Sequence, residues 1–456
     1  MVPGNWPEGM IAPLSIEAIK TNPRNARVHS ARQIAKLAGS ITAFGFVVPV
    51  IVDEENLLLC GHARVEAAAQ IGLTTVPVIR IRHLSAVEKR AFVIADNRLA
   101  ELASWDDDLL RQELKFLDEL AVEFDFSVIG FDTAEIDLVL DSPASPNGKD
   151  DRLPETSPTE QPVTELGDLW VLGKHRLFCG DALAPSSYEV LLAGERAHMA
   201  ITDPPYNVPI DGHVGGLGVV KHREFVMASG EMTREQFSTF LRKAMENMRA
   251  HTLDGSLQFI FMDWRHMEEL IAAGKRVYTE LKNLCVWNKS NAGMGSLYRS
   301  KHELVFVFKN GTAAHINNVE LGVHGRYRTN VWDYAGINSF GRGRDGLLAL
   351  HPTVKPVALI ADAIKDCTKR GHLILDPFAG SGTTIIAAEK TRRRAAVIEI
   401  DHLYADAIVR RWQTYTGKQA VCAKTGATFA EREAALVTPH MEDGISRGGG
   451  AGHHGQ

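Results

Sequence analysis

Short apolar runs alternate with stretches of helical periodicity in the second part of the chain. The runs have strand length and are rich in β-branched or aromatic residues. Between them, helices are expected from Pro356 onward and over 403–416. This alternation predicts a doubly wound α/β sheet, in which ligands bind beyond the carboxyl ends of the strands. The expected strands are 197–202, 258–262, 284–287, 304–308, 372–375 and 395–398.

The first part of the chain shows a different mixture of patterns. An Ala-rich helical segment covers 62–70 and ends before Gly72, and helical periodicity then continues from Ala86 to about Leu120. These elements predict a small α+β domain over residues 1–141. Its expected strands are 47–52, 57–60 and 76–81.

Two further segments carry little hydrophobic pattern. Residues 142–165 contain five prolines and no aromatic residue, which predicts a semi-extended linker. The tail 438–456 is rich in glycine and predicts a disordered end, so its adjacent histidines are not expected to bind metal. The second domain is therefore expected to cover 166–437.

Composition narrows the class of protein. Among 456 residues, 45% are hydrophobic and 23% are charged, which is typical of globular proteins and excludes fibrous or wholly disordered ones. No uncharged apolar stretch approaches the roughly 18–20 residues of a membrane span, so no membrane partner is expected. The five cysteines are scattered and never spaced C-x-x-C, which favours a reducing cytoplasm and predicts no zinc site. The net charge of −6 argues weakly against nucleic acid, but an average can hide local basic patches.

A glycine-containing turn follows the expected strand 372–375. Its sequence, D-P-F-A-G-S-G at 376–382, lets a ligand approach the backbone closely. The spacing is not G-x-G-x-x-G and no G-K-[ST] follows, which disfavours a phosphate-binding loop. Glu399 ends the next strand, about 20 residues farther on, where an acidic residue suits ribose hydroxyls. Together they favour a nucleoside-type cofactor over a simple tight turn.

A second motif, D-P-P-Y, follows the expected strand 197–202. The two prolines lack backbone donors but keep their carbonyl acceptors. Asp203 and the Pro204 carbonyl can therefore receive the hydrogens of an amino group, while Tyr206 can stack on a planar base. A rigid loop with a capping Asp is the alternative interpretation.

The two motifs together resemble those of the DNA amino-methyltransferases, over most of residues 166–420. The D-P-P-Y motif precedes the glycine turn, an order similar to the β class, which is a circular permutation of the usual Rossmann-like methyltransferase sheet. The resemblance implies S-adenosylmethionine (SAM) as cofactor. Further matching segments are Gly180–Leu183, Trp287–Lys289, Tyr298–Arg299, His302–Glu303 and His351–Pro356.

The same resemblance implies roles for individual residues. The methyl group would pass directly to an exocyclic amine of a base flipped out of double-stranded DNA. Asp181 would face the cofactor adenine, and the Lys355 ammonium could pair with the cofactor carboxylate. The implied catalytic residues are Asp203, Pro204, Pro205 and Tyr206. The implied cofactor-binding residues are Asp181, Thr353, Lys355, Asp376, Phe378, Gly380, Gly382, Thr383 and Glu399.

The target base is narrowed by two further features. The chain contains no Pro-Cys dipeptide, so carbon-5 methylation of cytosine through a cysteine nucleophile is not expected. Family members with Asp at the position of Asp203 mostly modify adenine N6, whereas those with Ser mostly modify cytosine N4. We therefore expect an adenine-specific enzyme, with cytosine N4 as the alternative.

The same residues are compatible with two different functions. The chain could be an RNA methyltransferase, or a partition-type DNA-binding nucleotide switch with a non-catalytic methyltransferase scaffold. The resemblance implies a cytoplasmic, nucleoid-associated protein encoded by a bacterium or phage. A homodimer and a cognate restriction enzyme are both compatible with it and not decided by the residues.

Two loops combine basic with aromatic residues, a composition that suits phosphate contact and base stacking. They are 208–229 and 311–350, and the second lies where the β class has its target-recognition region. A basic solvated loop is the alternative in each case. The candidate DNA-binding residues are Lys221, Arg223, Arg326, Arg328, Arg342 and Arg344.

Residues 11–100 resemble the N-terminal domain of ParB-like partition proteins, a fold shared with sulfiredoxin. The resemblance rests on 22–25, Gly45 and the G-H-A-R sequence at 61–64. Partition proteins carry G-E-R-R at the last of these and bind a nucleoside triphosphate there, so nucleotide binding is left open. The stretch 18–40 has five basic residues and no acidic one, which suits either DNA docking or a solvated helix face.

Overall fold

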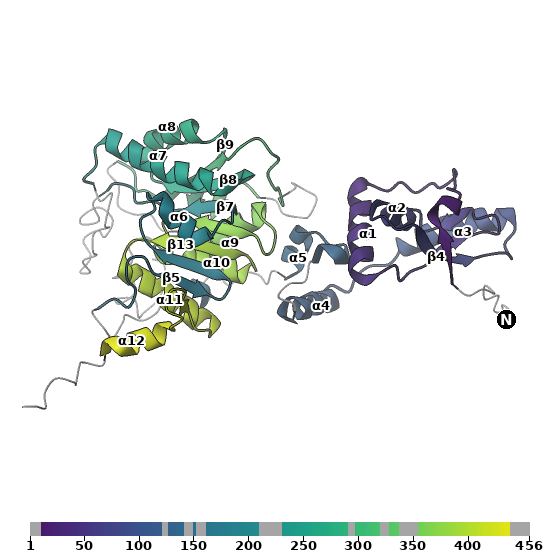
Figure 1. The fold of residues 1–456 in the computed structure, drawn as a ribbon. Coiled ribbons are helices and arrows are strands. Elements are labelled where there is room, and N and C mark those ends of the chain that lie inside the picture. Colours follow the sequence, from purple (N-terminus) through teal and green to yellow (C-terminus); the bar gives the residue numbers. More distant parts are fainter. Residues whose placement is uncertain are drawn as a thin grey trace, which may run out of the picture. The chain divides into compact units, whose positions relative to one another are not determined.

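The computed structural model forms two compact units, Met1–Ser142 and Pro143–Gln456 (Figure 1). It describes residues 11–120, 126–140, 149–151, 161–208, 230–290, 297–319, 328–336 and 354–437. None of the helices in these ranges is long and apolar enough to cross a membrane. The expected tail 438–456 lies outside the described residues.

The first unit contains a four-stranded sheet in the order β1-β4-β2-β3. Strands β4 and β2 are parallel, and the outer pairs are antiparallel. This α+β arrangement confirms the expected fold class of the unit. The strands are β1 (Ala12–Ser15), β2 (Val50–Val52), β3 (Leu58–Cys60) and β4 (Thr75–Arg80). The helices are η1 (Ile16–Ala18), α1 (Ala31–Phe44), α2 (His62–Gln70), α3 (Ala86–Ala100), α4 (Asp107–Leu120), η2 (Phe126–Ile129) and α5 (Thr133–Leu140).

The helix boundaries in this unit have local causes. Gly61 precedes α2 with φ +95°, and a Cβ there would lie 2.7 Å from Val50 Cγ1, so glycine is required at this turn. Ser85 and Glu88 form a reciprocal capping box that opens α3. The helical periodicity expected from Ala86 to about Leu120 corresponds to two helices, because the chain leaves the helical conformation after α3 and begins a new helix at α4.

Three of the five basic side chains in the stretch 18–40 bind acidic groups of their own unit. Arg27 pairs with Glu101. Arg32 and Lys36 lie 2.7 Å and 3.1 Å from the carboxylate of Asp132. The Arg32 and Lys36 pairs fasten α1 to the segment before α5, and DNA docking by the stretch 18–40 stays a prediction.

The second unit is built on a ten-stranded sheet in the order β11-β9-β10-β8-β7-β12-β13-β6-β5-β14. Its central strands, from β8 to β6, are parallel, whereas β10 and β5 pair antiparallel with their inner neighbours. The expected doubly wound α/β sheet is confirmed. The strands are β5 (Leu169–Leu172), β6 (His175–Cys179), β7 (Ala197–Thr202), β8 (Thr252–Met262), β9 (Glu280–Asn288), β10 (His302–Lys309), β11 (Val331–Asp333), β12 (Leu373–Asp376), β13 (Arg394–Glu399) and β14 (Val421–Cys422).

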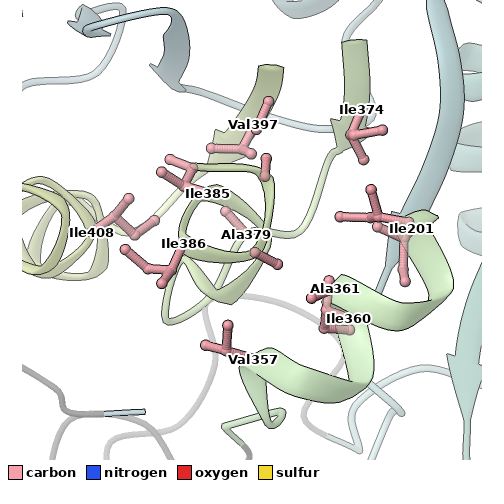
Figure 2. Close-up of a cluster of buried hydrophobic side chains, with 14 of the residues drawn as sticks. Ile201, Val357, Ile360, Ala361, Ile374, Ala379, Ile385, Ile386, Val397 and Ile408 are labelled. Carbon is pink, nitrogen blue, oxygen red and sulfur yellow. The ribbon is translucent and has the colours of Figure 1, made fainter. Parts of the chain in front are cut away.

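Helices connect these strands and cover the sheet. Strand residues of β7, β12 and β13 pack against α9, α10 and α11 in one buried apolar cluster, whose labelled members in Figure 2 are Ile201, Val357, Ile360, Ala361, Ile374, Ala379, Ile385, Ile386, Val397 and Ile408. Full burial of each Ile or Val side chain contributes about 1.5–3 kcal/mol. The helices are η3 (Lys149–Asp151), α6 (Pro185–Leu192), α7 (Arg234–Ala250), η4 (Trp264–His266), α8 (Met267–Val277), α9 (Val357–Cys367), α10 (Thr383–Lys390), α11 (His402–Thr416) and α12 (Phe429–Val437).

The segment expected to be a linker, 142–165, is partly docked on this unit. The Asp151 carboxylate accepts a hydrogen bond of 2.8 Å from the Val357 backbone N–H at the start of α9. Arg411 of α11 donates to the Asp150 carbonyl at 3.2 Å. The backbone N–H groups of Val163 and Thr164 both donate to the buried carboxylate of Asp406. The described parts therefore belong to the second unit, because their polar groups satisfy helix ends that composition does not reveal.

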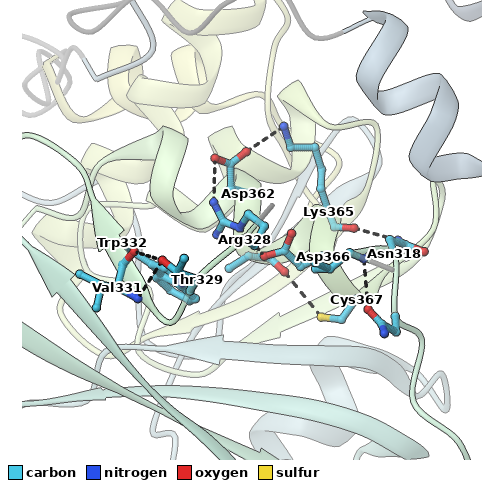
Figure 3. A network of polar contacts seen from close by, with 12 residues as sticks. Asn318, Arg328, Thr329, Val331, Trp332, Asp362, Lys365, Asp366 and Cys367 are labelled. Carbon is cyan, nitrogen blue, oxygen red and sulfur yellow. Dashed lines mark hydrogen bonds and ion pairs between the residues drawn. The ribbon is translucent and has the colours of Figure 1, made fainter. Parts of the chain in front are cut away.

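Arg328 lies in a network of charges rather than at a free surface (Figure 3). Its guanidinium donates to Asp366 at 3.0 Å and lies 3.4 Å from Asp362, both on α9. It also donates to the Tyr334 hydroxyl at 2.8 Å and lies 5.4 Å from the centre of the Trp332 ring. Although burial disfavours the charge, these acidic neighbours raise the pKa of Arg328 above its ordinary value. Arg328 thereby attaches the segment before β11 to α9, and its contact with DNA stays a prediction.

We predict that Arg328→Met lowers the free energy of unfolding by about 2–4 kcal/mol, because Asp366 loses its buried cation. Chemical denaturation measures this. Arg242→Met is the matched control, since Arg242 forms an exposed pair with Glu246 on one helix, and its removal is expected to change stability by less than about 0.5 kcal/mol. If Arg328→Met has unchanged stability but binds DNA more weakly, Arg328 acts at the DNA interface instead.

Candidate active site

One cavity lies at the edge of the sheet where the parallel strands β6, β13, β12 and β7 end. It has a volume of about 1200 Å³, including space open to solvent. The turns after these four strands all contribute to its wall. The strand order therefore gathers segments that are almost 200 residues apart in the sequence, from Asp203 to Glu399.

The turn after β7 presents the D-P-P-Y motif to this cavity, and all four of its residues line the wall. The Tyr206 hydroxyl donates to Asp203 Oδ1 at 2.6 Å. The Lys355 ammonium forms an ion pair with Asp203 Oδ2. Both oxygens of the Asp203 carboxylate are thus engaged within the protein. Burial raises the pKa of Asp203 above its ordinary value, although Lys355 opposes this rise.

A second carboxylate, Glu303 at the start of β10, lies beside this pair. Its Oε2 is 3.2 Å from the Lys355 ammonium and 3.3 Å from the Tyr206 hydroxyl. Glu303 also pairs with Lys289, which follows β9. Burial alone would raise the pKa of Glu303, but the two lysines outweigh it and lower the pKa to about 2. The same two carboxylates raise the pKa of Lys355 against the effect of burial.

Asp376, at the end of β12, joins neighbouring parts of the wall. Its carboxylate accepts hydrogen bonds from the hydroxyls of Thr202 at 2.8 Å and Thr384 at 2.6 Å. It also accepts from the Phe378 backbone N–H at 3.1 Å. Burial raises the pKa of Asp376 to about 6. The residue therefore fixes the glycine turn relative to the end of β7.

Glu399 ends β13 and reaches the glycine turn. Its Oε2 accepts a hydrogen bond of 2.8 Å from the Gly380 backbone N–H, and its Oε1 accepts from the Asp401 backbone N–H at 2.9 Å. Burial raises the pKa of Glu399 to about 7. Tyr404 and Ile400 lie on the same wall. Carboxylate oxygens beside an aromatic and an aliphatic side chain suit a nucleoside, which presents hydroxyls and a flat base.

The cavity gathers most of the residues predicted for catalysis and cofactor binding. Those that line it are Asp203, Pro204, Pro205, Tyr206, Lys355, Asp376, Phe378, Gly380, Thr383 and Glu399. Two predicted residues do not. The Asp181 carboxylate accepts from the Leu183 backbone N–H at 2.8 Å, while its neighbours Gly180 and Ala182 form the wall. Gly382, with φ +75°, packs against Ile408, where an added Cβ would lie 3.0 Å from two side-chain atoms.

Several predicted residues lie outside the described parts of the chain. They are Thr353, Lys221, Arg223, Arg326, Arg342 and Arg344. Their cofactor-binding and DNA-binding roles stay predictions. Within the described residues, no group of three or more His, Cys, Asp or Glu side chains is placed to hold a metal ion.

Sequence reasoning left Glu303 and Lys289 without a role. One signal was available, because Glu303 directly precedes the apolar run of β10, where a charge must be paired or exposed. Asp401 and Tyr404 were also missed, although they directly follow β13, at the edge where ligands are expected.

Comparison with known proteins agrees with this geometry. A family described as DNA methylase (N6_N4_Mtase) matches residues 197–410, which contain both motifs. The ParB N-terminal domain family matches 5–98, and the ParB-methyltransferase HTH (helix-turn-helix) domain family matches 108–166.

Individual relatives are similar to parts of the chain. The chain is 26% identical over 211 residues to YubD of Escherichia coli, which is named as a methylase, covering 46% of this chain and 79% of YubD. It is 37% identical over 75 residues to the E. coli ParB-like nuclease domain-containing protein YnaK, covering 16% of this chain and 86% of YnaK. The solved structure of PvuII DNA methyltransferase (cytosine-N4-specific) aligns with a TM-score of 0.41 and 15% identity over 57% of this chain and 91% of that chain. The chain carries a DNA methylase domain of the N6/N4 family, together with N-terminal ParB and ParB-methyltransferase HTH domains.

Proposed function

We propose that this DNA methyltransferase transfers a methyl group from SAM to the exocyclic N6 of adenine in DNA. The observation that carries the proposal is the placement of Asp203, a buried carboxylate at the end of β7, in the same cavity as the glycine turn and Glu399. Family members with an Asp at this position mostly modify adenine. DNA substrate follows from the family, and the HTH and ParB domains support it.

The residues of the cavity fit SAM. Glu399 and Asp401 supply acidic groups for the ribose hydroxyls, and Phe378, Ile400 and Tyr404 supply apolar surface for adenine. Gly380 presents backbone rather than a side chain to this space. When bound, SAM supplies an electrophilic methyl group on a positively charged sulfur.

The residues of the D-P-P-Y motif would then orient the target amine. Asp203 and the Pro204 carbonyl accept its hydrogens, which turns the nitrogen lone pair toward the methyl carbon. The nitrogen forms the new bond to carbon, the electron pair of the broken carbon–sulfur bond stays on sulfur, and one N–H proton leaves to Asp203. Asp203 also stabilises the positive charge that develops on nitrogen. Because the amine is inaccessible in a stacked duplex, the base has to be flipped into the cavity.

Nucleoside analysis of DNA from cells that express the protein tests this function, with DNA from cells that express Asp203→Ala as the control. We expect N6-methyladenine in the first sample only, and sequencing with modification detection then gives the recognition sequence. N4-methylcytosine instead would overturn the choice of base. DNA binding without either product would favour a partition-type switch, and methylation of RNA in competition would favour an RNA enzyme.

We predict that Asp203→Ala lowers the single-turnover rate of methyl transfer by at least about 100-fold, because the amine loses its charged acceptor. The dissociation constant for SAM, measured by calorimetry, is expected to change by less than about threefold, since the glycine turn and Glu399 remain in place. Loss of SAM binding in this variant would contradict the assignment of Asp203 to the amine.

We predict that SAM affinity rises by up to about tenfold as the pH increases through about 7, because Glu399, whose pKa burial raises to about 7, then becomes an ionised acceptor for the ribose. Below that pH the protonated carboxyl is a weaker acceptor. Calorimetry at several pH values measures this. Glu399→Gln is expected to remove the rise, and Glu246→Gln on the exposed face of α7 to keep it; the same rise in Glu399→Gln would assign it to another group.

A further inference from the structure

The Lys355 ammonium lies between two carboxylates that come from different strands. Asp203 follows β7, and Glu303 opens β10. The Tyr206 hydroxyl spans the same two groups, at 2.6 Å from Asp203 Oδ1 and 3.3 Å from Glu303 Oε2. The lysine side chain is only 6% exposed, so water compensates poorly for the loss of a carboxylate partner. Lys355 therefore has two alternative anions within reach.

This arrangement bears on the proposed reaction. The target amine needs an acceptor, but Tyr206 binds one oxygen of Asp203 and Lys355 binds the other. A lysine that stayed on Asp203 would also repel the positive charge that develops on the amine nitrogen. Lys355 must consequently give up Asp203 Oδ2 as the substrate arrives, and Glu303 is the second protein carboxylate that the described residues place beside its ammonium.

We propose that Glu303, held ionised by Lys289, is a positioning residue that takes over Lys355 and so frees Asp203 to accept the target amine. This inference rests on the proposed methyl transfer. Lys355 needs only a short movement, because its ammonium is already 3.2 Å from Glu303 Oε2. The proton that the amine later loses can then bind Asp203 Oδ2, the oxygen that Lys355 has left.

Lys289 gives Glu303 its fixed charge. It pairs with Glu303 Oε1, the oxygen opposite the one that faces Lys355, and lies 4.7 Å from the centre of the Trp287 ring. In support, the pKa of Glu303 is lowered to about 2, whereas that of Asp203 is raised by burial. Two carboxylates whose environments separate their pKa values in this way have different tasks.

The groups around Asp203 set the expected pH dependence. Lys355 lowers the pKa of Asp203, and Glu303 raises it. Tyr206 donates a hydrogen bond to Asp203, Asp376 faces it from the end of β12, and Asp263 faces Tyr206 from the end of β8. Removing the negative charge of Glu303 therefore lowers the pKa of Asp203. Removing the positive charge of Lys289 leaves Lys355 more strongly bound to Glu303, and this raises the pKa of Asp203.

The test compares Glu303→Gln and Lys289→Gln in single-turnover methyl transfer across pH. Activity requires ionised Asp203, so the rate falls on the acid side of its pKa. Glu303→Gln is expected to shift this acid limb to lower pH and to reduce the plateau rate by about 10- to 100-fold. Lys289→Gln is expected to shift the limb to higher pH and to reduce the plateau rate less than Glu303→Gln does, because Glu303 keeps its carboxylate. Shifts in the same direction, or none, would overturn the proposal.

A thermal titration provides a readout that needs no activity. Because the pKa of Asp203 is raised in the folded state, the stability of the protein relative to its Asp203→Asn variant falls as the pH rises from about 4 and levels off above that pKa. The pH at which this stability difference levels off, the levelling pH, should decrease in Glu303→Gln and increase in Lys289→Gln. Glu280→Gln, on β9 with an exposed Lys282 partner, is the control and should leave it unchanged.

The two readouts separate the possible failures. Absence of methyl transfer by the unaltered protein would reject the proposed function, while the thermal titration would still test Glu303. An unmoved levelling pH in a folded Glu303→Gln variant would reject the role of Glu303, even if the enzyme is active. If Glu303→Gln does not fold, Lys289→Gln alone decides, since a downward or absent shift there contradicts the proposal.

Discussion

Two carboxylates can be buried side by side only if cations offset their repulsion, and this constraint organises the catalytic end of the sheet. Lys355 pairs with both Asp203 and Glu303, and Lys289 pairs with the other oxygen of Glu303. Two negative charges are thus matched by two positive ones. The charges come from the ends of β7 and β9, from the start of β10 and from the segment before α9. The electrostatic balance therefore ties the antiparallel half of the sheet to the parallel half that holds the cofactor cavity.

The parallel half depends on hydrogen bonds between turns. Asp376 connects the end of β7 with the start of α10, and Glu399 connects the glycine turn with the start of α11. Each carboxylate thus bonds to protein groups in two turns, which holds the cavity wall in shape before any ligand binds. Such preorganisation reduces the conformational entropy that binding has to remove.

The sequence predicted what local pattern controls. β7 was expected at 197–202 and α2 at 62–70, and both were found there because a continuous apolar run and an Ala-rich segment bounded by glycines leave little choice. The cavity residues that follow strands were also predictable, since ligand sites lie at those ends. Long-range pairings were not. The Arg328 contacts with α9, the docking of 149–151 and the Glu303–Lys355 pair join segments dozens to hundreds of residues apart, and no periodicity encodes a partner.

The strand order also constrains how the protein can be synthesised. β6 and β7 leave the ribosome early, but in the sheet they are separated by β12 and β13, which are made almost 200 residues later. Until those strands emerge, β7 lacks its neighbour β12 and β6 lacks its neighbour β13. Asp203 likewise has no Lys355 to pair with until the segment before α9 is made. Domains generally fold as units during synthesis. Here the order of strands delays completion of the cavity until the chain has passed about residue 400, so a nascent chain that still lacks the glycine turn has only part of the cavity wall.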